Sequence, residues 1–327
     1  MTLAPRVVLV HRHTEYEELL ARHGSRGHAA FFLSSRGRSL DDTERRHHRN
    51  RAALAEVAAA VPSDWRGARV ERGDLDRFLF APDDVVVVVG PDGLVANAAK
   101  YLAGQPVIGI DTDPGRNPGV LVRHRAADAG RLLRAATTPG ADRHLEERTM
   151  VEAVADDTQR LLALNEVYLG QSGHQTARYR LTAPGGAPDG PPPDRREQSR
   201  SERDRPLRDR PEQNRSESQA SSGVLVGTGT GATGWCRSAW LERGSRLRLP
   251  GPADPALSWF VREAWPSPVT GTGLVQGLLT SGQRLLLAVE SDRLVAFGDG
   301  VESDALQLTW GQEIRIGVAA ERLRLLV

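Results

Sequence analysis

Residues 85–93 read Val-Val-Val-Val-Val-Gly-Pro-Asp-Gly, and this stretch decides the fold class. Five consecutive β-branched residues are typical of a strand buried on both faces, the kind found in parallel sheets. The strand ends at the turn 90–93, and a helix-like stretch follows over residues 94–103. Asp92 therefore stands between two glycines at the carboxyl end of a parallel strand, where open α/β sheets bind ligands. Glycines let the backbone approach a phosphate, and the next helix offers free N–H groups to an anion.

Neighbouring segments extend this strand into a sheet. Other short apolar runs are predicted to be strands, at residues 6–10, 68–70 and 107–110. A long helix is predicted over residues 39–60, where the end is rich in alanine. The order strand, helix, strand, helix, strand with short crossovers predicts an α/β domain with a doubly wound parallel sheet. The segment 111–116, Asp-Thr-Asp-Pro-Gly-Arg, should then lie beside the Asp92 turn, although it also fits an ordinary Asp-Pro-Gly turn.

The pattern changes after residue 146. One more helix is predicted over residues 146–160. Short strands separated by Gly and Asp turns follow, which is typical of an antiparallel, β-rich domain. These strands are predicted at residues 161–169, 177–181, 223–228, 284–289, 294–297, 306–308, 313–318 and 322–327. Residues 183–222 are dominated by Pro, Arg, Asp, Glu, Ser and Gln, and we interpret them as a disordered insertion between two strands.

Composition narrows the class of protein. The chain has 327 residues, a net charge of +1 and one cysteine, Cys236, which excludes a disulfide framework and an all-cysteine metal site. The near-zero charge predicts neither nucleic acid nor a membrane as partner. The N-terminus lacks the apolar core of a signal peptide, so we expect a cytoplasmic protein. The single lysine, Lys100, is not part of a Gly-Lys-Ser/Thr loop, which excludes a P-loop phosphotransferase.

Two further segments carry polar groups in apolar surroundings. Residues 163–167 read Ala-Leu-Asn-Glu-Val, and the Asn165-Glu166 pair offers donors and acceptors that match a sugar diol or an amide. The alternative is a surface pair at a strand end. Residues 221–235 run from an apolar strand into alternating Gly and Thr and then Trp235. Glycines expose backbone N–H groups and threonine hydroxyls donate to phosphate or ribose oxygens, while the alternative is a flexible loop.

Taken in this order, the segments resemble the NAD kinase family. Its members share a Gly-Gly-Asp-Gly-Thr turn, an Asn-Glu pair and a later Gly/Thr-rich segment. Here these are Gly-Pro-Asp-Gly-Leu at residues 90–94, the pair at 165–166, and Thr-Gly-Thr-Gly-Ala-Thr-Gly-Trp at 228–235. The closest likeness is to the mitochondrial-type branch, and it rests on residues 44–48, 106–114, 163–170 and 221–231.

The resemblance implies a two-domain fold and a reaction. Residues 1–125 would be the α/β nucleotide-binding domain and residues 126–327 the β-rich NAD-binding domain. The reaction transfers the γ-phosphoryl group of ATP, or of polyphosphate, to the 2′-hydroxyl of the adenosine ribose of NAD. Mg²⁺ would accompany the phosphates with few protein ligands, and no metal-ligating residue is assigned. Relatives suggest a homodimer.

The same resemblance assigns roles to residues. Asp92 would accept the proton of the ribose hydroxyl. Gly90 and Gly93 would lie against the nucleotide, and Asn165 with Glu166 would hold the ribose and adenine side of NAD. The other positions assigned to the dinucleotide are Thr228, Thr230, Gly231, Thr233, Gly234, Trp235 and Ser238.

The turn departs from the family pattern at two positions. Pro91 removes an N–H group that would otherwise be free to bind phosphate. Leu94 replaces a hydroxyl-bearing side chain with an apolar one. Two alternatives therefore stay open at the level of sequence: a catalytically impaired protein that binds NAD(H) or NADP(H) as a sensor, and a kinase of a different substrate on the same scaffold.

Overall fold

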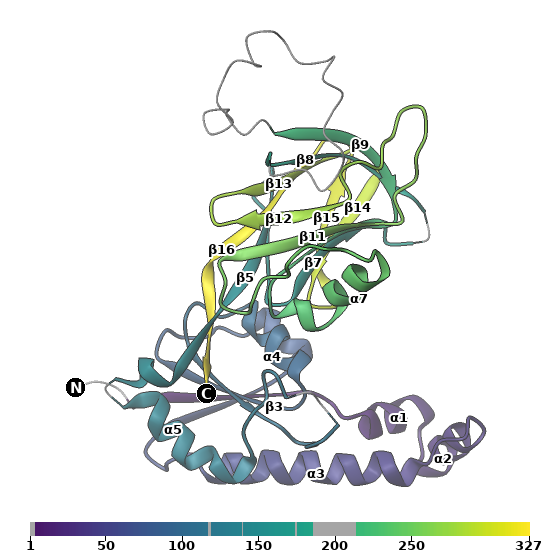
Figure 1. The fold of residues 1–327 in the computed structure, drawn as a ribbon. Helices are drawn as coiled ribbons and strands as arrows, with labels where there is room; N and C mark the ends of the chain where they lie inside the picture. Colours follow the sequence, from purple (N-terminus) through teal and green to yellow (C-terminus); the bar gives the residue numbers. More distant parts are fainter. Residues whose placement is uncertain (1–3, 117–118, 139, 174, 186–213) are drawn as a thin grey trace. The chain divides into compact units, whose positions relative to one another are not determined.

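The computed structural model describes residues 4–116, 119–138, 140–173, 175–185 and 214–327. The chain divides into two compact units (Figure 1). The first unit comprises residues 1–148 and 321–327, and the second comprises residues 149–320. The assignment of a nucleotide-binding domain to residues 1–125 and an NAD-binding domain to residues 126–327 stays a prediction.

A parallel sheet forms the centre of the first unit. Its strand order is β2-β1-β3-β4, and the end of β16 pairs with β4 in the same direction. The strands are β1 (Arg6–His11), β2 (Arg66–Glu71), β3 (Asp84–Val89), β4 (Pro106–Ile110) and β16 (Glu313–Leu326). All six residues of β3 are buried, as its five valines predict. The predicted α/β class with a doubly wound parallel sheet is confirmed.

Helices cover both faces of this sheet (Figure 1). The second half of α3 (Leu40–Ala59) and α5 (Ala129–Thr137) pack on one face through Leu54, Val57, Leu132 and Leu133. On the other face α4 (Asp92–Ala99) packs against β3 and the 3₁₀ helix η1 (Arg72–Arg77). The short helices α1 (Glu15–His23) and α2 (Arg26–Ser34) pack on the first half of α3.

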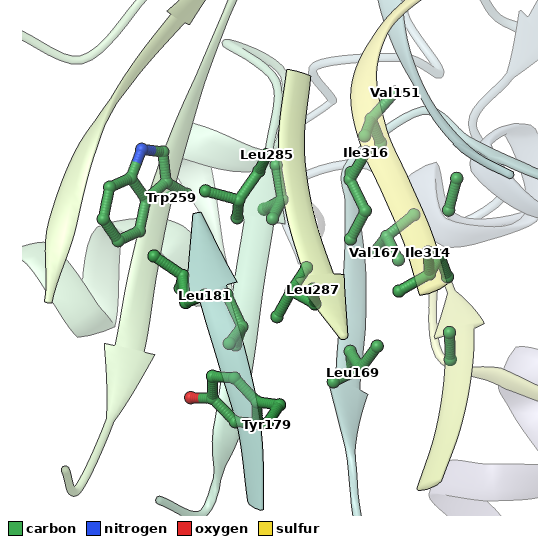
Figure 2. Close-up of a cluster of buried hydrophobic side chains, with 14 of the residues drawn as sticks. Val151, Val167, Leu169, Tyr179, Leu181, Trp259, Leu285, Leu287, Ile314 and Ile316 are labelled. Atoms are coloured by element: carbon green, nitrogen blue, oxygen red, sulfur yellow. The ribbon is translucent and has the colours of Figure 1, made fainter. Parts of the chain in front are cut away.

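The second unit is a sandwich of two antiparallel sheets. Side chains from both sheets meet in one apolar core, which Figure 2 shows around Tyr179, Trp259 and Leu287. One sheet contains the first part of β16 with β5 (Leu145–Ala155), β6 (Arg160–Ala163), β8 (Ala177–Ala183), β9 (Arg215–Ser221) and β13 (Arg284–Val289). The other runs in the order β12-β11-β10-β7-β14-β15, that is β12 (Gln276–Thr280), β11 (Ala256–Arg262), β10 (Gly223–Gly227), β7 (Glu166–Gly170), β14 (Arg293–Gly298) and β15 (Val301–Thr309).

The helix predicted over residues 146–160 is wrong, because this segment forms strand β5 up to Ala155. Val151, Ala153 and Ala155 alternate into the core, and Val151 and Ala153 pair with Ala163 and Leu161 of β6. β-Branched residues fit this pleated, half-buried position, and the pairing of this segment with β6 decides against a helix here.

The insertion predicted over residues 183–222 is also corrected at both ends. Ala183 ends β8, and residues 215–221 form β9, which pairs with β8 along its whole length. The polar residues of β9 misled the prediction, because its buried part is short and includes Gln219 and Ser221. The part of the predicted insertion at residues 186–213 lies outside the described residues.

Other differences concern strand boundaries and missed elements. The strand predicted over residues 161–169 is two strands, β6 and β7, which belong to different sheets. The strands predicted at 313–318 and 322–327 are one strand, β16. The prediction missed α2, α5, β11, β12 and α7 (Trp235–Glu242). Among the described residues, no helix combines the length and apolar character needed to span a membrane.

The close approach of two backbone segments at Gly109 gives a test of this packing. A Cβ atom at Gly109 of β4 would lie 2.1 Å from the carbonyl oxygen of Leu121. Because backbone cannot move aside as a side chain can, we expect Gly109→Ala to lower the free energy of unfolding by about 3 kcal/mol in urea denaturation. The matched control is Gly27→Ala in helix α2, where no atom lies within 4 Å of the new methyl group. Equal unfolding midpoints for the two variants would contradict the packing.

Candidate functional site

Asp92 is the first residue of helix α4, directly after the turn that ends β3. Its carboxylate accepts three backbone hydrogen bonds. Oδ1 accepts from the N–H groups of Leu121 (2.7 Å) and Val122 (2.9 Å), and Oδ2 accepts from Val120 (3.2 Å). An ionised carboxylate has about four acceptor positions, so Oδ2 keeps a lone pair for a further proton donor. The side chain is thus fixed in position without being saturated.

The turn after β4 lies next to the Asp92 turn, as the sequence predicts. Val89 of β3 pairs with Ile110 of β4, and the Gly90 N–H group donates to the Ile110 carbonyl at 3.1 Å. The Gly90 N–H group is therefore used within the sheet. Gly93, in contrast, is exposed, and no atom of another residue lies within 4 Å of the place that a Cβ atom would take there.

The segment 111–116 is anchored within the first unit. The Asp113 carboxylate pairs with Arg49 of α3 at 2.6 Å, and the Thr112 hydroxyl accepts from the Asn50 amide at 3.3 Å. Asp111 accepts the backbone N–H of Asp113 at 2.8 Å. These contacts favour the ordinary Asp-Pro-Gly turn over a binding loop.

A buried arginine places positive charge near Asp92. Arg148 has a side chain that is only 1% exposed and pairs with Glu146 at 3.0 Å. Its Nη2 also lies 3.4 Å from the carbonyl oxygen of Val120, the residue whose N–H group Asp92 accepts. Burial lowers the pKa of Arg148, while Glu146 and Asp92 oppose that shift. The segment 120–122 is therefore held in two ways: its N–H groups donate to Asp92, and the carbonyl of Val120 accepts from Arg148.

In the second unit, Asn165 lies in the turn where the chain passes from β6 to β7, and Glu166 is the first residue of β7. We call residues 164–166 the Asn165-Glu166 turn. The predicted position inside one strand is thus replaced by a turn between two sheets. Asp299, in the turn from β14 to β15, accepts the backbone N–H groups of Leu164 (2.8 Å), Asn165 (2.7 Å) and Glu166 (3.3 Å). Both predicted side chains are half-buried.

The Gly/Thr segment packs directly on this turn. The Thr228 N–H group donates to the Asn165 carbonyl at 2.9 Å, and the Thr228 hydroxyl donates to the Leu164 carbonyl at 2.5 Å. A Cβ atom at Gly231 would lie 2.2 Å from the Asn165 carbonyl oxygen. The glycine is thus needed for the close approach of two backbones. Segments about sixty residues apart in the chain form one structural feature.

The residues of the segment 228–238 that were predicted to contact the dinucleotide differ in how exposed they are. Thr228, Thr230 and Gly231 are buried, and the Thr228 hydroxyl also accepts from the N–H groups of Thr230 and Gly231. The Thr228 hydroxyl therefore has a structural role in holding this segment on the Asn165-Glu166 turn, and a contact of Thr228 with a dinucleotide stays a prediction. Trp235 is half-buried, and the exposed positions are Thr233, Gly234 and Ser238.

Aromatic side chains border the same turn. The rings of Tyr168 and Trp235 stack with centroids 5.1 Å apart, and the Arg262 guanidinium lies 5.4 Å from the centre of the Trp235 ring. The Tyr168 hydroxyl donates to the Ser222 carbonyl at 2.5 Å. Trp235, at the start of α7, is thus held in one orientation with a cation over its face.

Glu166 has an unusual protonation state. Burial, and then the negative charge of Asp299, raise the pKa of Glu166 from its ordinary value of 4.5 to about 8. Near neutral pH its carboxyl group is mostly uncharged and can donate a hydrogen bond. A perturbed carboxyl group in a turn beside glycines and threonines is a marker of a functional site.

Asp299, which accepts the three N–H groups of residues 164–166, is the residue of this candidate site that sequence reasoning missed. Asp299 and Gly300 have φ values of 54° and 66°, so the hairpin turn is the kind that Asp-Gly pairs favour. That dipeptide was a usable signal for the hairpin. Its reach to residues 164–166, more than 130 positions earlier, has no signal in a single sequence.

The described residues contain no group of three or more His, Cys, Asp or Glu side chains that could hold a metal ion. A divalent ion that took part in phosphoryl transfer would be held mainly by phosphate oxygens of the nucleotide.

Comparison with known proteins shows the fold. No family model and no curated protein matches the chain. Among solved structures, it resembles the crystal structure of an NAD kinase from Archaeoglobus fulgidus in complex with ATP, with a TM-score of 0.53 and 14% sequence identity. The match covers 98% of this chain and 93% of that chain. The chain therefore has an NAD kinase-like fold, whereas membership in the NAD kinase family and in its mitochondrial-type branch stays a prediction.

The protonation of Glu166 predicts how stability depends on pH. Between its ordinary pKa of 4.5 and the folded value of about 8, the folded protein binds a proton that the unfolded chain has lost. The free energy of unfolding therefore falls as pH rises through this window. Glu166→Gln removes the titrating group, so we expect a smaller fall in urea denaturation at a series of pH values. Exposed Glu302 of β15 gives the control Glu302→Gln. Parallel wild-type and Glu166→Gln curves would contradict the prediction.

Proposed function

We propose that the chain is an NAD kinase, which transfers the γ-phosphoryl group of ATP to the 2′-hydroxyl of the adenosine ribose of NAD and yields NADP. The NAD kinase-like fold supports a kinase of this type. The fold alone does not carry the activity, because one fold serves several chemistries. Support for the activity must therefore come from the side chains at the Asp92 turn and at the Asn165-Glu166 turn.

One observation in the second unit carries the proposal. The Asn165-Glu166 turn packs against the segment 228–235, and Trp235 at the end of that segment stacks on Tyr168. Backbone hydrogen bonds, a glycine contact and an aromatic stack join segments that the sequence separates. Asn165 and Glu166 offer an amide and an uncharged carboxyl group to a nucleoside. Trp235 offers a half-buried aromatic side chain, and Thr233 and Ser238 offer exposed positions near it in the chain.

In this proposal Asp92 accepts the proton. The ribose 2′-oxygen attacks the γ-phosphorus, the bond to the β–γ bridging oxygen breaks, ADP leaves, and the hydroxyl proton passes to Asp92. Asp92 suits this role because three N–H groups fix it while Oδ2 keeps an acceptor position. Mg²⁺ would arrive with the ATP phosphates and neutralise charge on the transferred group.

The two departures from the family turn are compatible with this role. Pro91 precedes α4 with a φ of −80°, near the angle that its ring imposes. Leu94 is only 2% exposed and packs over Gly90, where a Cβ atom would lie 3.0 Å from Leu94 Cδ2. The apolar substitution therefore falls on a buried side of the turn, and not on a surface open to phosphates.

The remaining expectations are part of the same proposal. We infer a homodimer in the cytoplasm, with nucleotides as ligands and without nucleic acid or membrane partners. ATP is the proposed donor and polyphosphate the alternative. NADP formation measured with each donor separates the two.

The direct test is Asp92→Asn in an assay of NADP formation from NAD, ATP and Mg²⁺. Losing the general base should lower turnover by about two to four orders of magnitude, while the affinity for NAD changes little. Because an amide also places an N–H group opposite that of Val120, thermal unfolding is measured in parallel. The control is Asp83→Asn at the opposite end of the same strand, where the side chain forms an exposed pair with Arg66. Normal turnover in folded Asp92→Asn would rule out the proposed base.

A further inference from the structure

Asp299 both accepts hydrogen bonds from the turn 164–166 and donates one to it. The Asp299 carboxylate accepts the N–H groups of Leu164, Asn165 and Glu166, and the Asp299 N–H group donates to the Glu166 carbonyl at 3.1 Å. The aspartate stands at the end of β14, which pairs with β7. The main chain that carries Asn165 and Glu166 is thus fixed by one side chain from the neighbouring hairpin.

The surroundings of Glu166 contain few charges besides Asp299. Strand β10 and the adjoining segment 228–234 carry only apolar residues, glycines and threonines. Helix α7 brings Cys236, and burial raises the pKa of this thiol, so that it stays neutral. The other charged residues of α7, Arg237 and Glu242, are exposed. Arg160 of β6 lies in an ion pair with Glu152, and Arg293 stands at the far end of β14.

We propose that Asp299 is a positioning residue of the dinucleotide site, which fixes the Asn165-Glu166 turn through its three hydrogen bonds and places a negative charge beside Glu166. The identity of the ligand, NAD, rests on the proposed function. The effect of Asp299 on Glu166 does not, because it exists in the ligand-free protein.

The arrangement selects a part of the ligand. An uncharged carboxyl group and an amide offer donors to a ring nitrogen or a hydroxyl oxygen. Within the described residues of this turn and of the segment 228–234, no arginine or lysine is available to a phosphate. The turn therefore contacts the nucleoside portion, and its affinity for NAD falls when Glu166 loses its proton. Burial and the charge of Asp299 raise the pKa of Glu166 and place that loss at about pH 8.

The first experiment measures Glu166 without ligand. Carboxyl ¹³C chemical shifts of glutamate-labelled protein are followed against pH, and Glu166→Gln identifies the signal. In Asp299→Asn the titration midpoint of Glu166 should move down by about one pH unit, because a neighbouring negative charge has been removed. An unchanged midpoint would overturn the electrostatic part of the proposal, whether or not the protein makes NADP.

The second experiment measures the dissociation constant of NAD by calorimetry between about pH 6 and about pH 9. Wild-type affinity should fall by about tenfold across this range, the effect of about one hydrogen bond. Glu166→Gln stays neutral and can still donate, so its affinity should not vary with pH. In Asp299→Asn the loss should begin at lower pH.

The double variant Asp299→Asn with Glu166→Gln tests whether Asp299 acts on the ligand through Glu166 or only supports the structure. If Asp299 acts through the proton of Glu166, then Asp299→Asn should weaken binding much less in the Glu166→Gln background than in wild type at the same pH. Equal weakening in both backgrounds would overturn the electrostatic part of the proposal and leave only the hydrogen bonds of Asp299 to the main chain. The matched control is Glu217→Gln, since Glu217 likewise accepts the N–H groups of Gly273 and Leu274. Absence of NAD binding in the wild type would contradict the proposed function, and the ligand-free titration would still decide the role of Asp299.

Discussion

Successive backbone N–H groups at a tight turn need acceptors, and in each unit one aspartate provides them. Asp92 accepts three such groups from residues 120–122, and Asp299 accepts three from residues 164–166. A carboxylate suits this task because both its oxygens only accept, whereas an amide presents a donor on one side. Leaving these N–H groups buried without an acceptor would cost about 1–3 kcal/mol each. The candidate functional turns are therefore rigid for the same physical reason.

These turns also depend on glycines, which allow two backbone segments to approach each other closely. At Gly109 and Gly231, a side chain would overlap a carbonyl oxygen of the segment that the aspartate organises. The same holds for Gly229, where a Cβ atom would lie 2.0 Å from the carbonyl oxygen of Gly251. The Gly/Thr pattern thus reflects packing of main chain on main chain as much as access for a ligand. The buried Thr228, which bonds only within the protein, leads to the same conclusion.

Local chemistry predicted the first unit well. The run of valines at 85–89, the neighbouring strand at 107–110 and the turns after them follow from periodicity and from glycine, and their adjacency follows from the rules of parallel sheets. The second unit was harder. Residues 146–160 were predicted to be a helix, but the pairing of Val151 with Ala163 makes their first part a strand. Polar strand β9 was interpreted as insertion because its pairing with β8 is invisible to composition. Asn165, Glu166 and Asp92 were identified from the sequence, whereas the carboxylate of Asp299 depends on a contact that only folding creates.

The chain passes between the two units twice, within β5 and within β16. Residues 321–327 return to the first unit, where Leu325 and Leu326 are buried and Leu325 pairs with Val107 of β4. The first unit is thus interrupted by the second in the order of synthesis. Its edge beside β4 stays open on the ribosome until the whole of the second unit has emerged, and during that interval β4 is exposed to wrong partners. Early folding of the intervening sandwich would shorten the delay, because it brings the two halves of the interrupted unit back together.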